Sequence, residues 1–463
     1  MTSARELVIG IDVGTTSMKA HAFELDGTIV GRATLPTVWD VGINGEAQID
    51  ADSLAETAIQ VLVRAIPDSV PAGAVIGIGI TGMAETGVLV NTQLKPIVPA
   101  IAWYDERGKS ELQSLPVDFA QEFMAHTGLG FKAECSFSKL LWHVRKGQKI
   151  ERDTKWLNAL EYIAFRLTGS VFTEPSLASR TGLLDQGSGL PWIPALENLG
   201  ATPSLLPEMR NAGTPFGSVM PSVSEKLRGA VVTVAGHDHL VGAIGAGAIN
   251  GDDLYNSCGT ADVVLRSVSR TLTNLERSKL VHGGLSAGMH VLPGVTAILG
   301  ATRSGLVLGR VMSMLGANDR ESRREIADNW DSSATHFSEV SVTEPPEWAN
   351  EVTIALRGDI SPKDLWSAAM RYTLEKTGEL VHAVDDIAGP YDFAVAAGGW
   401  ARIDGVYRGK SLVMPGLKRF DGEEPGARGA ASLAALAAHQ TNVPLTANLA
   451  VSFAQPSHKE LIS

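Results

Sequence analysis

The same short pattern occurs twice in this chain, and it restricts the possible fold more than any other feature. An apolar strand that begins at Leu7 ends in the small polar turn Gly14-Thr15-Thr16, and a second strand follows. The stretch Leu254–Leu265 repeats strand, turn and strand, with Gly259-Thr260 placed 245 positions after Gly14-Thr15. Two halves that begin alike predict two related domains that share a ligand. A chance match between two ordinary hairpins is the alternative, because Gly favours many kinds of turn.

The other segments alternate between helix and strand patterns. Asp52–Ile66 carries its apolar residues on one helical face, and Ser53 with Glu56 forms a possible capping box. Buried strands and helices follow at Ala74–Thr81, Glu161–Thr168, Val231–Ala235, Leu240–Ile249, Ser361–Ile387 and Phe393–Ala396. This alternation predicts an α/β fold. We expect a domain boundary within residues 247–252, between 248 and 249.

Composition excludes several classes of protein. Of the 463 residues, 44% are apolar and 19% are charged, which allows a large core and excludes intrinsic disorder. The 51 acidic residues outnumber the 39 basic ones, which argues against nucleic acid or an anionic membrane as a partner. Cys135 and Cys258 are the two cysteines, so a disulfide framework is excluded. No apolar run approaches the roughly 20 residues of a membrane helix. We therefore expect a protein of the cytoplasm.

Three formal motif matches do not fit their required contexts. The run Gly77–Gly82 matches the dinucleotide fingerprint G-x-G-x-x-G, but it lies inside a β-rich stretch and does not open a helix. The run Gly284–Gly288 matches the nucleophile elbow G-x-S-x-G, but a strand pattern follows it where a helix is required. The Walker A sequence is absent from the chain. These observations argue against a Rossmann enzyme, a serine hydrolase and a P-loop enzyme.

The segment His237-Asp238-His239 offers three metal-ligating side chains in a row. We expect these neighbours to point in different directions, which disfavours a shared ion. Asp238 lies between a buried strand and a helix rich in small residues. Its position leaves two roles open, a catalytic carboxylate or a helix N-cap, which Asp often provides.

The two Gly-Thr turns suit phosphate binding. Gly allows the backbone to approach a ligand closely, and neighbouring N–H groups and hydroxyls can surround phosphate oxygens. Asp12, immediately before the first turn, could hold Mg²⁺ beside those phosphates. The pair of turns therefore favours a nucleotide site.

Several ordered segments of this chain resemble the FGGY family of carbohydrate kinases, which belongs to the superfamily of sugar kinases, heat-shock chaperones and actin. Trp103, Asp105 and Arg107 match the family's W-x-D-x-R pattern. Other similar segments are Ile9–Lys19 (first phosphate motif), Ser138–Trp142, Arg166–Gly169, Asn256–Thr260 (second phosphate motif), Ala397–Trp400 and Gly426–Ala431 (adenosine region and closing helix). The resemblance extends from Val8 to about His439.

The resemblance implies two ribonuclease-H-like (actin-like ATPase) domains with an interdomain active-site cleft. Residues 1–248 would form the domain that binds sugar and phosphate, and residues 249–463 the domain that binds ATP. The family's general base is an Asp in a G-x-D-N-like segment, and Gly236-His237-Asp238-His239 occupies that place. His239 departs from the more common Asn. Ala84 stands where some members carry a substrate-contacting His or Arg.

We therefore predict ATP-dependent phosphorylation of a hydroxyl on a small sugar or polyol, with ATP and Mg²⁺ as cofactors and Asp12 as the metal ligand. Asp238 would be the base. The predicted substrate residues are Glu85, Trp103, Asp105 and His239, and the predicted ATP residues are Thr15, Thr16, Gly259, Thr260, Gly305, Gly398 and Gly399. A homodimer is compatible with this prediction. A nucleotide-driven conformational ATPase, like the chaperone and actin branches, is the alternative and has no use for a sugar pocket.

Glu85 and Ala84 bear on the choice of substrate. A buried Glu without a partner would be costly, which is a reason to expect substrate hydroxyls beside Glu85. A Glu in a surface loop is the alternative. Ala84 lacks the cationic or imidazole group of some relatives, which predicts a weaker preference for a carbonyl or anionic group. This favours a neutral polyol or sugar over an acidic one.

Overall fold

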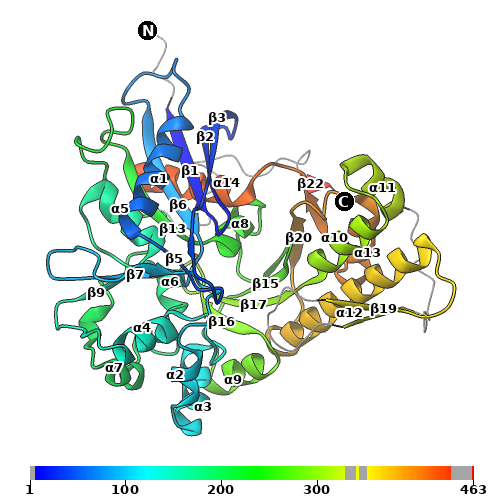
Figure 1. The fold of residues 1–463 in the computed structure, drawn as a ribbon. Coiled ribbons are helices and arrows are strands. Elements are labelled where there is room, and N and C mark those ends of the chain that lie inside the picture. Colours follow the sequence, from blue (N-terminus) through cyan, green and yellow to red (C-terminus); the bar gives the residue numbers. More distant parts are fainter. Residues whose placement is uncertain (1–5, 329–339, 344–351, 440–460, 463) are drawn as a thin grey trace. The chain divides into compact units, whose positions relative to one another are not determined.

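The computed structural model describes residues 6–328, 340–343, 352–439 and 461–462, and these form two compact units (Figure 1). The first unit contains the described residues up to Gly251, Ser267–Ile298, and the chain from Glu423 onward to His439. The second contains Asp252–Arg266, the described residues between Leu299 and Gly422, and a short strand at Leu461–Ile462. The compact units are thus discontinuous in sequence, whereas the predicted domains are continuous.

A six-stranded mixed sheet forms the centre of the first unit. Its order is β12 (Gly217–Ser218), β13 (Val231–His237), β6 (Val75–Gly82), β1 (Leu7–Val13), β2 (Ser17–Glu24) and β3 (Ile29–Pro36). β1 and β13 both run parallel to β6, while β2 is antiparallel to β1. In this register Asp12 lies beside Thr81, and Thr81 lies beside Gly236. The parallel strands therefore end at one edge of the sheet and bring Asp12 and the Gly236–Asp238 segment to the same place.

The two faces of this sheet carry different side chains, and different helices of the first unit cover them. Ile9, Ile11, Ile78 and Ile80 are fully buried in one core with residues of α1 (Ala51–Arg64) and α5 (Ala159–Thr168). The intervening positions carry glycines, and these lie under α14 (Pro425–His439) together with α8 (Asp238–Gly245). Figure 1 shows α14 beside β1 and β6. Since side chains alternate along a strand, large residues and glycines face opposite sides.

Close helix packing explains the G-x-G-x-x-G match. A Cβ added at Gly79 would come within 1.9 Å of the carbonyl oxygen of Ala430, and one at Gly77 within 2.7 Å of that of Ala434. A Cβ added at Gly10 on β1 would come within 1.8 Å of the carbonyl oxygen of Ala427. The glycines are therefore required for contact between α14 and the sheet, and the structure has no helix opening at this motif.

Shorter elements complete the first unit. They are β4 (Asp40–Val41), β5 (Ala47–Ile49), β7 (Gly87–Val90), β8 (Ala100–Ile101), α2 (Lys109–Gln113), α3 (Val117–Thr127), α4 (Ser136–Arg145), β9 (Lys155–Asn158), α6 (Pro175–Ser179), β10 (Leu184–Asp185), β11 (Leu190–Pro191), α7 (Ile193–Leu199), α9 (Asn274–His282) and β16 (Ser286–Met289). β16 coincides with the G-x-S-x-G match itself, and residues 290–294 after it form a turn, so the strand expected after the motif is wrong while the helix that a nucleophile elbow requires is absent there.

The second unit is built on a sheet in which the strands follow the order β17-β15-β14-β20-β21-β22. These strands are β17 (Thr296–Thr302), β15 (Asp262–Val268), β14 (Asp253–Cys258), β20 (Phe393–Ala397), β21 (Lys418–Phe420) and β22 (Leu461–Ile462). The helices are α10 (Ser304–Met314), α11 (Arg320–Asp328), α12 (Pro362–Ala388) and α13 (Asp404–Val413), and β18 (Val340–Thr343) pairs with β19 (Thr353–Leu356). A core around the fully buried Trp366 joins α10 and α12.

Most predicted elements are confirmed, and one cap is wrong. α12 begins at Pro362 after the N-cap Ser361, as the sequence indicates. α1 begins earlier than its predicted start, because Asp50 accepts a hydrogen bond from the backbone N–H of Ser53 at 2.8 Å. Asp50 therefore caps this helix, and the expected capping box of Ser53 and Glu56 does not form. Within the described parts of the chain, no helix has the length and apolar character needed to cross a membrane.

Candidate active site

The first Gly-Thr turn is held rigidly by aromatic and hydroxyl side chains. Trp39 Nε1 donates to the carbonyl of Thr15 at 2.7 Å, and Trp103 Nε1 donates to the hydroxyl of Thr15 at 2.9 Å. Thr37 donates to the carbonyl of Gly14 at 2.8 Å. The structure thus brings a predicted phosphate residue, Thr15, into contact with a predicted substrate residue, Trp103. Thr16 lies exposed on the same turn.

Asp12 sits at the end of β1 in an environment that suits a cation. Its Oδ1 is buried and has no hydrogen-bond partner among the described residues. Burial, Asp238 and Glu424 raise the pKa of Asp12 to about 8, against a smaller opposing effect of Lys19. An orphaned carboxylate oxygen repelled by two other carboxylates fits a divalent cation such as Mg²⁺, which prefers oxygen ligands.

Asp238 is the first residue of α8, and it is not the N-cap. His237 occupies the N-cap position and makes no side-chain capping bond, while Asp238 Oδ1 accepts from the backbone N–H of His239 at 2.7 Å. Burial raises the pKa of Asp238 to about 7, and Glu85 adds to this effect, against the hydrogen bond from His239 and the charge of Arg180. A carboxylate with a pKa near neutrality can accept a proton during a reaction.

The imidazoles of His237 and His239 converge on Asp238, so the expectation that the three side chains point apart is wrong. The Nε2 atoms of His237 and His239 lie 3.3 Å and 3.9 Å from Asp238 Oδ1, and one ligand atom from each residue lies within 4.8 Å of the others. The reason is that the chain changes from strand to helix at Asp238, which bends neighbouring side chains toward one side. Burial lowers the pKa of His239 to about 4 and that of His237 well below its usual value, so both rings are neutral near pH 7.

The backbone before Asp238 is fixed from two sides. Thr81 donates to the carbonyl of Gly236 at 2.7 Å, and the N–H of His237 donates to the hydroxyl of Ser176 at 3.1 Å. Ser176 in turn donates to the carboxylate of Glu174, which is fully buried. Gly236 has φ 107°, and a Cβ there would meet the Ser176 hydroxyl at 2.6 Å. Thr81, Ser176 and Glu174 therefore hold the segment from Gly236 to Asp238 in place.

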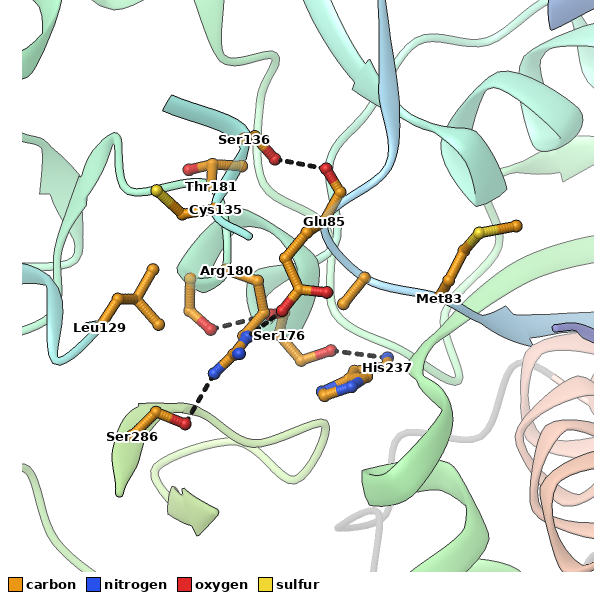
Figure 2. A network of polar contacts seen from close by, with 12 residues as sticks. Met83, Glu85, Leu129, Cys135, Ser136, Ser176, Arg180, Thr181, His237 and Ser286 are labelled. Carbon is orange, nitrogen blue, oxygen red and sulfur yellow. Dashed lines mark hydrogen bonds and ion pairs between the residues drawn. The ribbon is translucent and has the colours of Figure 1, made fainter. Parts of the chain in front are cut away.

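Glu85 lies in a polar network that the sequence did not predict. Arg180 Nε donates to Glu85 Oε1 at 2.7 Å, and Arg180 Nη1 donates to the hydroxyl of Ser286 at 2.9 Å (Figure 2). Ser136 donates to the backbone carbonyl of Glu85 at 2.8 Å. Glu85 is 9% exposed, which excludes the surface-loop alternative. The premise that Glu85 lacks a protein partner is wrong, because Arg180, the C-cap residue of α6, donates to it.

Asp105 has a structural environment. Its two carboxylate oxygens accept hydrogen bonds from the N–H of Ala47 and from the backbone and guanidinium of Arg107, and its side chain is 1% exposed. These contacts support a positioning role for Asp105 near β5 and favour it over the predicted contact with a sugar.

The predicted ATP residues of the second unit gather around one pocket. Gly259, Thr260, Gly305 and Gly399 line a cavity of about 1040 Å³. Gly398 has φ 108°, and a Cβ there would lie 2.5 Å from the carbonyl of Cys258, directly before the turn. Trp400, from the segment that resembles the adenosine region, also lines the cavity, together with three residues that the sequence reasoning did not select, Arg310, Arg323 and Arg402. The volume and the glycine backbone suit a nucleotide.

A match to a protein-family model identifies the family of the chain. Residues 7–245 match the N-terminal domain of the FGGY family of carbohydrate kinases. The chain belongs to this family.

Individual FGGY relatives are distant in sequence. L-fuculokinase from Escherichia coli K12 is 28% identical over 280 residues, a match covering 58% of this chain and 58% of that enzyme. Among solved structures, xylulose kinase from Rhodospirillum rubrum has 22% identity and a TM-score of 0.81, covering 96% of this chain and 92% of that one. Plasmodium falciparum glycerol kinase with ADP has 17% identity and a TM-score of 0.83, covering 99% and 94%. These likenesses confirm the two-domain actin-like ATPase fold that the sequence predicted.

The FGGY resemblance in the sequence did not reveal Arg180, Ser176 or Ser286. These residues come from α6, its C-terminal cap and β16, which are far from Glu85 and Asp238 in sequence. The signal that could have found Arg180 is the presence of Glu85 at a strand end, since a buried carboxylate requires a partner.

Proposed function

We propose that this chain transfers the γ-phosphate of ATP to a hydroxyl of a small sugar or polyol. The observation that supports this most directly is the setting of Asp238. The backbone just before this carboxylate is held at the end of a parallel strand by Thr81 and Ser176, and burial raises the pKa of Asp238 to about 7. Such a group is suited to take the proton of an attacking hydroxyl. Membership of the FGGY family supports the same reaction class.

In this proposal each predicted group has a distinct task. Asp238 accepts the hydroxyl proton, and Glu85, Trp103 and His239 contact the acceptor. The turns at Thr15-Thr16 and Gly259-Thr260 hold phosphate oxygens through backbone N–H groups and hydroxyls. Gly305 and Gly398 pack against the backbone of the second phosphate turn, where a Cβ would not fit, and Gly399 leaves open space for the nucleotide at the cavity wall.

Mg²⁺ would be held by Asp12, whose orphaned oxygen fits this ion. When bound, it would offset negative charge on the transferring phosphoryl group. The neighbouring Glu424 is paired with Lys19 at 2.9 Å, which leaves Asp12 as the carboxylate that needs a cation.

An ADP-release assay tests the proposal. The protein is incubated with ATP and Mg²⁺, alone and with each member of a panel of ketoses, aldoses, polyols and sugar acids. ADP formed only when one of these acceptors is present supports a kinase. ADP released at the same rate without any acceptor supports the conformational ATPase instead and contradicts the proposal.

A further inference from the structure

The carbonyl oxygens of the first Gly-Thr turn are all engaged by one neighbouring segment. Thr37 donates through its hydroxyl to the carbonyl of Gly14 at 2.8 Å, and through its N–H to that of Thr16 at 3.0 Å. Trp39 Nε1 donates to the carbonyl between them, that of Thr15, at 2.7 Å. Within the described parts of the chain, the N–H groups of Thr15 and Thr16 donate to no protein acceptor. The turn therefore has its acceptors occupied and two backbone donors free, an arrangement that favours an anion.

The hydroxyl of Thr15 is oriented by Trp103. Trp103 Nε1 donates to Thr15 Oγ1 at 2.9 Å. An indole N–H is only a donor, so the hydroxyl oxygen must receive this bond with a lone pair. The hydroxyl hydrogen of Thr15 is thereby directed away from Trp103, and it meets no acceptor among the described residues. Thr15 is half-buried and Thr16 is exposed, so a ligand can reach this hydrogen and the two free N–H groups.

The turn lies at the edge of the sheet where the proposed reaction takes place. It follows directly on β1, whose end lies beside Thr81, and Thr81 lies beside Gly236, two residues before Asp238. The first turn and the proposed base therefore belong to the same edge of the same unit. The part of ATP that must come to this edge is the transferred phosphoryl group, because the hydroxyl that Asp238 deprotonates attacks it.

We propose that Trp103 is a positioning residue, whose indole N–H turns the hydroxyl hydrogen of Thr15 toward an oxygen of the transferring phosphoryl group. This inference rests on the proposed kinase function. An ionised phosphoryl oxygen only accepts hydrogen bonds, so it matches this hydrogen and the free N–H groups of the turn. A hydroxyl that accepts one hydrogen bond is also a stronger donor in the next. The role uses the N–H edge of Trp103 and is separate from the predicted contact of its ring with the acceptor molecule.

A double-mutant cycle between Trp103 and Thr15 tests this role. Trp103→Phe removes the N–H, Thr15→Val removes the hydroxyl with little change of shape, and kcat is measured with ATP, Mg²⁺ and the best acceptor of the panel. We expect kcat to fall about 10- to 100-fold in Thr15→Val, since a hydrogen bond to a charged group is lost, and about 3- to 10-fold in Trp103→Phe. The double variant should stay within about 2-fold of Thr15→Val, because no hydroxyl is left to orient. Losses that multiply in the double variant, or wild-type kcat in Trp103→Phe, would overturn the proposal.

Matched controls separate this role from packing and from acceptor binding. Benzothienylalanine at position 103 replaces the N–H by sulfur and keeps the shape of the ring, so it should lower kcat as Trp103→Phe does. Trp156→Phe removes a buried N–H that has no hydrogen-bond partner among the described residues, and it should keep the kcat of the wild type. If Trp103 served only to contact the acceptor, Trp103→Phe would raise the KM for the acceptor equally with and without Thr15→Val and would leave kcat unchanged. That result also contradicts the proposal.

A second measurement keeps this inference separate from the proposed reaction. If the wild type phosphorylates no member of the panel, the proposed function fails, and calorimetric titration with a nonhydrolysable ATP analogue and Mg²⁺ decides the role of Trp103. Binding that weakens about 3- to 10-fold in Trp103→Phe, with no further loss when Thr15→Val is added to Thr15-dependent binding and with unchanged binding of ADP, supports the role. Equal binding of the analogue by wild type and Trp103→Phe, losses that multiply, or no binding by the wild type rejects it.

Discussion

At the scale of single residues, Asp238 carries the proposed chemistry. Replacing it with Asn keeps the shape and the hydrogen bond from the N–H of His239, but the amide cannot take a proton. We predict that Asp238→Asn lowers kcat by about 10²-fold or more and leaves the Kd for ADP within about 3-fold. Asp153→Asn, at an exposed site of the same unit, is the matched control. Wild-type turnover in Asp238→Asn would show that another group is the base.

The same carboxylate predicts a pH dependence. Burial and Glu85 raise the pKa of Asp238 to about 7 from an ordinary value of 3.8. A base must be deprotonated, so kcat/KM should fall about tenfold for each pH unit below 7 and become constant above it. The measurement is a pH–rate profile on the natural acceptor. A profile that stays flat down to pH 5 would contradict this environment for Asp238.

At the scale of elements, the start of α10 packs directly on the second Gly-Thr turn. A Cβ at Gly305 would come within 1.8 Å of the carbonyl of Gly259, so Gly305→Ala must displace the turn or the helix. We predict that this variant weakens ADP binding by about 10-fold or more, measured by calorimetry. Gly378→Ala, in the middle of α12 with its nearest neighbour at 3.7 Å, is the control and should bind ADP normally. Unchanged binding in Gly305→Ala would separate this turn from the nucleotide site.

The N-terminus of α6 predicts a second pH effect, this time on stability. Burial raises the pKa of Glu174 to about 8 from an ordinary 4.5. Between pH 4.5 and pH 8, Glu174 is therefore protonated in the folded protein and ionised in the unfolded chain. The free energy of unfolding contributed by Glu174 falls as the pH rises from about 4.5 to 8. In Glu174→Gln the side-chain NH₂ group can take the place of Oε1, which is buried and has no hydrogen-bond partner among the described residues, so the neutral amide replaces the carboxyl group without a change of shape. We predict a gain on the order of 2 kcal/mol in the free energy of unfolding at pH 8 and little change at pH 5. Urea titrations at both pH values measure it, and an equal effect at both would contradict the assignment.

Features of the site that are encoded in one short run of sequence could be predicted, and contacts between segments distant in sequence could not. The turns at Gly14-Thr15 and Gly259-Thr260 and the strand before Asp238 are encoded in short runs, and the structure has them where the sequence predicts. The partners of Glu85 and of the backbone at His237 come from distant segments, and only the fold brings Arg180 and Ser176 there. The convergence of His237 and His239 was missed because it depends on the bend at the strand–helix junction.

The fold follows the same rule. Long periodic segments such as α12 are predictable from their pattern and cap, because Ser361, Pro362 and the apolar spacing agree. The membership of α14 in the first unit is not predictable from residues 425–439 alone. It depends on glycines of β1 and β6 that admit the helix, and these lie more than 300 positions away in sequence.

At the scale of the whole molecule, the proposed reaction needs groups from both units. Asp238 belongs to the first unit and the cavity beside Gly259 and Thr260 belongs to the second, so phosphoryl transfer requires them to act on the same molecules. We predict that a nonhydrolysable ATP analogue and the acceptor together lower the radius of gyration in solution more than either alone. Small-angle scattering measures this. Curves that superimpose with and without saturating ligands would contradict the prediction.

The most direct test of the central claim is the stoichiometry of products from one reaction. Wild type and Asp238→Asn are incubated with ATP, Mg²⁺ and the best acceptor of the panel, and ADP and the phosphorylated acceptor are quantified by mass spectrometry. We predict one sugar phosphate for each ADP with the wild type, and neither product above background with Asp238→Asn. ADP without a phosphorylated acceptor, or equal product from both proteins, would contradict it.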